Sequence, residues 1–105
     1  MSNLNQKVII TAALTGAITP SGYNIPETPE QIAEAAYECW KLGAAVVHLH
    51  MRDEKGIGTM DAARFRKTVD LLRAHKDCDV VINCTSSGAV SPTDEERMAH
   101  MRTID

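Results

Sequence analysis

The sequence contains no long hydrophobic run. Its first residues are polar, and the apolar stretch at residues 8–10 is far too short for the core of a signal peptide or for a membrane span. We therefore expect a cytoplasmic protein that has no membrane partner. Cysteines are also few, with no CxxC pair and no small secreted disulfide framework around them. We expect reduced, mostly buried thiols at Cys39, Cys78 and Cys84.

Clusters of positive charge and phosphate-binding motifs are absent as well. The 11 basic and 14 acidic residues are mixed along the chain and give a formal net charge of −3, which disfavours a nucleic acid partner. Neither GxGxxG nor a Walker glycine-lysine pattern is present, which disfavours a phosphate loop. The chain has 105 residues, of which 44% are hydrophobic, a composition that is typical of globular proteins. Its length allows at most one folding unit.

Three apolar or β-branched runs predict strands at residues 7–13, 44–51 and 79–84. The middle run is continuous except for two histidines, which is typical of a parallel strand covered on both faces. Helical periodicity predicts a helix after each run. This alternation specifies an α/β fold with a parallel sheet and right-handed crossovers.

Capping residues mark the helix ends. Residues 28–31 (Thr-Pro-Glu-Gln) fit a capping box with proline at the first helical position, and Gly43 closes that helix. Asp61 can cap the second helix, and residues 91–94 start the third. Helical spacing predicts buried faces that comprise Ile32, Ala35, Ala36, Cys39 and Trp40, then Phe65, Val69 and Leu72, then Met98 and Met101.

Two architectures agree with this order of elements. A doubly wound open sheet needs helices on both faces, whereas a closed (β/α)₈ TIM barrel needs about 250 residues. Three parallel strands leave two unpaired edges, and a chain of this size buries only ~60–65% of its unfolded surface. We therefore expect residues 1–105 to be marginally stable alone.

His48 and His50 lie two residues apart on the predicted strand at 44–51. Their side chains therefore point to one face, with Cα atoms roughly 6.5 Å apart, so that both imidazoles can reach one ion. Zinc accepts imidazole nitrogens, and a catalytic zinc site keeps one position open for water or substrate. Active sites of α/β proteins also form at the carboxyl ends of parallel strands. The alternative is a structural pair, with one histidine in the core and one at the surface.

Arg52 and Asp53 extend the pair to the motif His-Leu-His-Met-Arg-Asp. They either form a solvated ion pair in a turn or bond to the histidine rings and orient them. In the second case a carboxylate or carbonyl would bond the distal ring nitrogens and fix each tautomer.

Small residues follow the third predicted strand, at 85–90. This loop precedes a helix N-terminus, so its hydroxyls and amides can hold an anion such as a carboxylate, although such residues are also plain turn material. Cys84 lies at the rim of the loop without a nearby base in the sequence, which disfavours a nucleophilic thiol.

The sequence resembles the β-keto acid cleavage enzymes over essentially all 105 residues. The segments VIITAALTGAITP, TPEQIAEAAYECWKLGAAVVHLHMRD and VINCTSSGAV carry the resemblance, and HLHMRD after GAAVV is the most specific part. It implies a (β/α)₈ barrel, usually oligomeric, that binds one divalent metal, typically zinc, through His48 and His50. It also implies an exchange between a β-keto acid and acetyl-CoA that gives acetoacetate and a new acyl-CoA by Claisen and retro-Claisen steps. The residues implied to bind the substrate carboxylate are Thr85, Ser86, Ser87 and Gly88.

Two departures from the family pattern matter. After Thr-Gly-Ala, the enzymes of amino-substituted substrates have a glutamate for the substrate's ammonium group, whereas this chain has Ile18, which favours a neutral or apolar substrate tail. The family's glutamate metal ligand and its catalytic arginine and aspartate lie beyond residue 105. We therefore expect residues 1–105 to be the N-terminal part of a single barrel domain, apparently truncated and inactive alone. Its expected partners are the remaining part of the barrel or further copies of the chain.

Two other interpretations stay open. One is a non-catalytic remnant of this fold that oligomerises through its sheet edges and its methionine-rich third helix. The other is a small open-sheet module that binds an anion at the loop of residues 85–88.

Overall fold

The computed structural model describes residues 6–18, 20–87 and 93–104. Its centre is a parallel sheet of three strands, in the order β1 (Thr11–Ala13), β2 (Val46–Leu49) and β5 (Val81–Cys84). The predicted parallel α/β arrangement is confirmed. The first strand is shorter than predicted, because residues 8–10 are exposed and only the Ile10 carbonyl among them accepts hydrogen bonds from the chain before β2.

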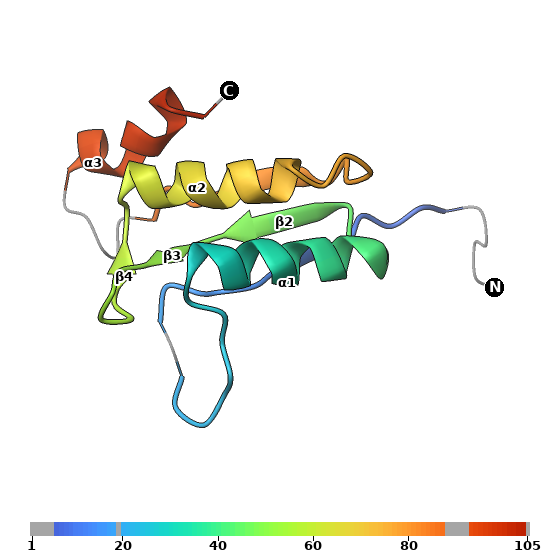
Figure 1. Ribbon diagram of the computed structural model, residues 1–105, viewed down its shortest axis with the longest axis horizontal. Coiled ribbons are helices and arrows are strands. Elements are labelled where there is room, and N and C mark those ends of the chain that lie inside the picture. Colours follow the sequence, from blue (N-terminus) through green and yellow to red (C-terminus); the bar gives the residue numbers. More distant parts are fainter. Residues whose placement is uncertain (1–5, 19, 88–92, 105) are drawn as a thin grey trace.

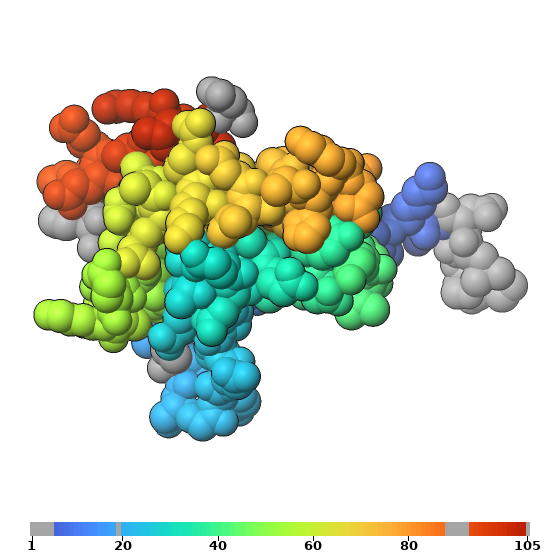
Figure 2. Space-filling model, in the orientation of Figure 1, coloured from blue at the N-terminus to red at the C-terminus, as the bar shows by residue number. Residues whose placement is uncertain are grey.

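Two helices cover one face of the sheet. Figure 1 shows α1 (Pro29–Lys41) and α2 (Ala62–Arg73) lying next to each other in front of the strands, and Figure 2 shows them as one continuous surface. Val47 and Leu49 of β2 point to these helices and are fully buried. The core of this layer comprises Ile32, Ala33, Ala36, Val47, Leu49, Met51, Met60, Phe65, Leu72, Cys78 and Val80.

The opposite face of the sheet is open within the described part of the chain. His48 alternates with the two buried residues of β2 and is only half-buried. Its neighbours on this face are exposed: Thr11, Ala13, Val81 and Asn83. The sheet therefore has one packed face and one face that carries polar groups.

The predicted capping box of α1 is present. The hydroxyl of Thr28 accepts a hydrogen bond from the Gln31 backbone N–H at 3.1 Å, and the Gln31 side-chain oxygen accepts one from the Thr28 N–H at 3.2 Å. Gly43 follows the last turn with a φ of 116°, a left-handed conformation that favours glycine. Both ends of α1 thus lie where local sequence predicted them.

Removing this cap should weaken the fold measurably. In Thr28→Ala the Gln31 N–H loses its partner, and we expect the free energy of unfolding to fall by about 1 kcal/mol. Thr28→Ser keeps a hydroxyl in place and should stay within ~0.5 kcal/mol of the wild type. Urea unfolding of the full-length protein measures both values. Equal losses in the two variants would contradict a role for the hydroxyl.

The predicted strand at residues 44–51 is interrupted at His50. After the break, β3 (Met51–Arg52) pairs antiparallel with β4 (Gly58–Thr59). The turn between them is closed by Asp53, whose carboxylate accepts the backbone N–H groups of Lys55 and Ile57 at 2.8 and 3.0 Å. This local turn bends the chain away from the parallel sheet directly after the histidine pair.

The prediction that Met98 and Met101 face inward is wrong. Helix α3 (Asp94–Met98) passes into the 3-10 helix η1 (Ala99–Arg102), and the two methionines are 44% and 54% exposed. Residues three apart lie on the same side of an α-helix or a 3-10 helix, so the two methionines share a side that differs from that of His100. The residue that turns inward is His100, which is fully buried against the ring of Phe65 at a centroid distance of 4.5 Å.

Among the described residues, no helix combines the length and the apolar character needed to cross a membrane.

Candidate functional site

Three loops meet at the carboxyl end of the parallel sheet. The chain leaves β1 into residues 14–18, β2 into His50 and the β3–β4 hairpin, and β5 into residues 85–87. In Figure 1 the hairpin and α3 lie at this same end, and the N-terminus lies at the other. A hydrogen bond of 3.0 Å from the Thr85 N–H to the Leu49 carbonyl fixes the start of the last loop beside the histidine pair.

The two histidine rings lie together, as their spacing predicted. The ring centroids of His48 and His50 are 5.0 Å apart, with an angle of 74° between the ring planes. Nδ1 of His48 is hydrogen-bonded to Oδ1 of Asn83, the residue opposite it on β5. This bond engages one ring nitrogen of His48, so Nε2 is the nitrogen that can bind a metal.

The surroundings of His50 favour its neutral form. Partial burial is the main cause that lowers the pKa of His50 below its usual value, and the electrostatic effects of the neighbouring His48 and Arg52 side chains lower it further. A neutral imidazole keeps the lone pair that a metal ligand needs.

The donor set fits a divalent metal in part. Two imidazoles with free nitrogens suit zinc, which takes nitrogen ligands in a tetrahedral arrangement. Within residues 6–18, 20–87 and 93–104, no further histidine, cysteine, aspartate or glutamate completes a group of three with them. A metal held here needs at least one ligand from outside these residues.

Arg52 ties the first loop to the end of β2. Its side chain is 1% exposed, and Nη1 donates to the Ala17 carbonyl at 2.9 Å. Nε and Nη2 have no hydrogen-bond partner among the described residues. These two donors form the edge of the guanidinium that binds carboxylates in a bidentate manner.

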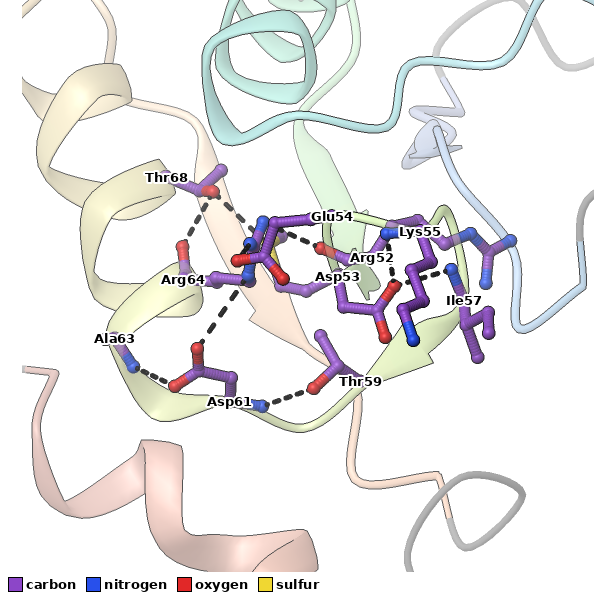
Figure 3. Close-up of polar contacts among 11 residues, drawn as sticks. Arg52, Asp53, Glu54, Lys55, Ile57, Thr59, Asp61, Ala63, Arg64 and Thr68 are labelled. Carbon is purple, nitrogen blue, oxygen red and sulfur yellow. Dashed lines mark hydrogen bonds and ion pairs between the residues drawn. The ribbon is translucent and has the colours of Figure 1, made fainter.

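Asp53 stabilises the turn of the β3–β4 hairpin. Figure 3 shows its carboxylate directed into the β3–β4 turn, while Arg64 reaches from α2 to the Arg52 carbonyl at 3.0 Å and to the carboxylate of Glu54. No hydrogen bond joins Arg52 or Asp53 to a histidine ring within the described residues. Within the described residues, the hydrogen bond to the His48 ring comes from Asn83 instead.

The loop after β5 is held from several sides. The buried hydroxyl of Thr85 accepts the Ser87 N–H at 3.1 Å, and Arg97 of α3 donates to the Ser86 carbonyl at 2.8 Å. Ser86 is exposed and Ser87 half-buried. Gly88, the fourth residue predicted to bind the substrate carboxylate, lies outside the described residues.

Ile18 lies in the loop after β1, and its side chain is 80% exposed. The loop is anchored on either side of Gly16, by the Arg52 bond to Ala17 and by the Thr15 hydroxyl, which donates to the Pro26 carbonyl at 2.8 Å. The backbone of this loop is thus anchored, and it carries an exposed apolar side chain.

Sequence reasoning missed Asn83 and His100. A polar residue inside the run VINC was the available signal for Asn83, but its partner depends on the register between β2 and β5. His100 lies against the backbone of Cys84 and Thr85, and neither of its ring nitrogens has a hydrogen-bond partner of good geometry. Burial lowers the pKa of His100, so its ring supports the loop as a neutral group.

Cys84 points away from the histidines, toward the helix side of β5, where it is partly buried against the core. Burial raises the pKa of its thiol to about 11. This agrees with the expectation that Cys84 is not a nucleophile.

The Cys84 thiol should therefore react slowly with iodoacetamide. At pH 8 a thiol with a pKa of about 11 is only ~0.1% thiolate, and its labelling rate should rise about tenfold per pH unit up to pH 10. Peptide mapping by mass spectrometry follows the labelled site, with free glutathione as a reference. Labelling of Cys84 at the rate of glutathione would contradict this environment.

The fold and the site define an α/β protein with a paired-histidine site at the carboxyl end of a parallel sheet. The chain belongs to the β-keto acid cleavage enzyme family, whose sequence profile matches residues 7–105.

Relatives of this chain have names that describe the cleavage of a keto acid or an acetyl-CoA-dependent transfer. The chain is 43% identical over 95 residues to a 3-keto-5-aminohexanoate cleavage enzyme of Fusobacterium nucleatum, covering 89% of this chain and 35% of that protein. It is 47% identical over 96 residues to a 3,5-dioxohexanoate:acetyl-CoA acetone transferase of Paraburkholderia graminis, covering 89% and 30%. It is 44% identical over 87 residues to a 3-dehydrocarnitine:acetyl-CoA trimethylamine transferase of Rhizobium meliloti, covering 80% and 29%. The chain thus spans about a third of the length of these relatives.

Proposed function

We propose that the full-length protein containing this chain is a zinc-dependent enzyme that exchanges a β-keto acid with acetyl-CoA, giving acetoacetate and a new acyl-CoA. The observation that carries the proposal is the pair of neighbouring imidazoles at the carboxyl end of β2, one of them oriented by Asn83. Membership of the family and the names of the relatives support the reaction class.

The described sheet is, in this proposal, the first part of a (β/α)₈ barrel. Both helices lie on one side of the sheet, as in a barrel, whereas a doubly wound sheet has helices on both faces. The outer edge of β5 borders a hollow of about 230 Å³ lined by residues that include Ile82, Met101 and Ile104. A following strand would fill that hollow, and one from the rest of the barrel would supply the missing metal ligand.

In this reaction, residues of this chain bind the metal and bind and orient the substrate. His48 and His50 hold the metal, which when bound supplies a Lewis acid for the keto oxygen of the substrate. The hydroxyls of residues 85–87, with Gly88, receive the substrate carboxylate. The anchored loop of residues 15–18 places Ile18 near the other end of the substrate.

An apolar residue at position 18 suits a substrate whose tail carries no charge. A cationic tail would lose hydration beside Ile18 without gaining a carboxylate in return. A neutral tail buries apolar surface there and needs no partner. We therefore propose a neutral or apolar β-keto acid as the substrate.

The test uses the full-length gene product with acetyl-CoA and β-keto acids of neutral and cationic tails. We expect acetoacetate and the matching acyl-CoA, detected by liquid chromatography and mass spectrometry, with the larger kcat/KM for neutral tails. A chelator should stop turnover, and added zinc should restore it. A zinc-loaded protein that produces no acetoacetate from any keto acid would exclude this function. Self-assembled subunits without metal or turnover would instead favour the oligomerising remnant.

A further inference from the structure

We propose that Asn83 is a positioning residue that holds His48 as the tautomer protonated on Nδ1 and so directs Nε2 toward the metal. This inference rests on the metal site in the proposed function. It adds a specific role for a residue on the neighbouring strand that neither bears charge nor binds the metal itself.

The register of the sheet creates the contact. His48 and Asn83 are paired residues of the parallel strands β2 and β5, so their side chains project side by side from the open face. Both residues lie inside regular strands, and the strand that carries His48 is paired on either side. Asn83 is exposed within the described chain, so its side-chain amide is not packed in the core and can make a hydrogen bond in the site.

The chemistry of the two groups sets the tautomer. The Oδ1 atom of Asn83 is a carbonyl oxygen that only accepts hydrogen bonds, so the Nδ1 atom of His48 must carry the proton. A neutral imidazole has one N–H, which leaves the lone pair on Nε2. Outer hydrogen bonds of this kind fix ring orientation at metal sites.

The other histidine has no such support. Within the described chain no hydrogen bond to the His50 ring is recorded, and its ring stands across that of His48 at 74°. His48 is therefore the ligand whose direction is set before the metal arrives, and His50 is the one that adjusts.

Two variants of Asn83 separate the role of the acceptor from the role of size. Asn83→Leu keeps nearly the same shape but removes the acceptor, and we expect zinc affinity of the full-length protein to fall ~10–100-fold. Asn83→Asp keeps an oxygen that accepts from Nδ1 and should retain the affinity. Asn24→Leu, on an exposed loop residue, is the matched control and should change nothing. Competition with a chromophoric chelator measures each affinity.

The tautomer is measured separately, without zinc or turnover. Long-range ¹H–¹⁵N spectra of the metal-free protein, assigned with His48→Gln, should show the His48 proton on Nδ1 in the wild type and in Asn83→Asp, but not in Asn83→Leu. An Nε2–H tautomer in the wild type, or equal zinc affinity in Asn83→Leu, would overturn the proposal. An Nδ1–H tautomer in a protein that binds no zinc would refute the proposed function and uphold the hydrogen bond.

Discussion

His48→Ala should abolish zinc binding by the full-length protein. The wild type is expected to hold close to one zinc per chain, and the variant loses an imidazole nitrogen that an alanine methyl group cannot replace. The loss should exceed the ~100-fold that follows from losing an outer hydrogen-bond partner. Inductively coupled plasma mass spectrometry on protein dialysed against buffer measures the metal content, and turnover with acetyl-CoA should fall with it.

His75→Ala is the matched control for this experiment. His75 follows α2 at the opposite end of the sheet, where its ring stacks on Tyr37 at a centroid distance of 3.7 Å. Zinc content should therefore stay unchanged in this variant. Equal zinc content in His48→Ala and the wild type would reject the assignment of the metal site. Because His48 lies on the open face of β2, its replacement should leave the core of the fold intact.

Phe65→Ala should cause the largest loss of stability. Phe65 is fully buried in the core between α2 and β2, and its ring packs at a tilt against the buried ring of His100. Deleting the ring removes apolar burial and leaves a cavity, which together cost about 3–5 kcal/mol. Because the free energy of unfolding of a whole domain is only ~5–15 kcal/mol, this variant should unfold at a markedly lower urea concentration than the wild type.

The comparison for Phe65→Ala is Tyr23→Ala, which removes an aromatic ring that is 72% exposed in the loop before α1. Its effect should stay within ~0.5 kcal/mol. Urea unfolding followed by circular dichroism gives both values. If the two variants lose equal stability, the packing of Phe65 between α2 and η1 does not hold in solution.

Local patterns predicted a large part of this fold and part of the site. The capping box at Thr28, the cap at Asp61 and the closing Gly43 depend on neighbours within a few positions, and all three were confirmed. The pairing of His48 with His50 on one face followed from the two-residue period of a strand. The expectation for Met98 and Met101 failed because His100, between them in the sequence, takes the inward position against Phe65.

The sequence by itself determined the strand and helix alternation, the helix caps and the histidine pair, because each depends on residues close together in the chain. Only the tertiary structure decided that Asn83, 35 positions further on, meets His48, and that Arg52 reaches back to Ala17. Those contacts depend on the register of β2 against β5 and on the path of the loop after β1. The packing of the whole sheet sets both, and no short stretch of residues encodes them.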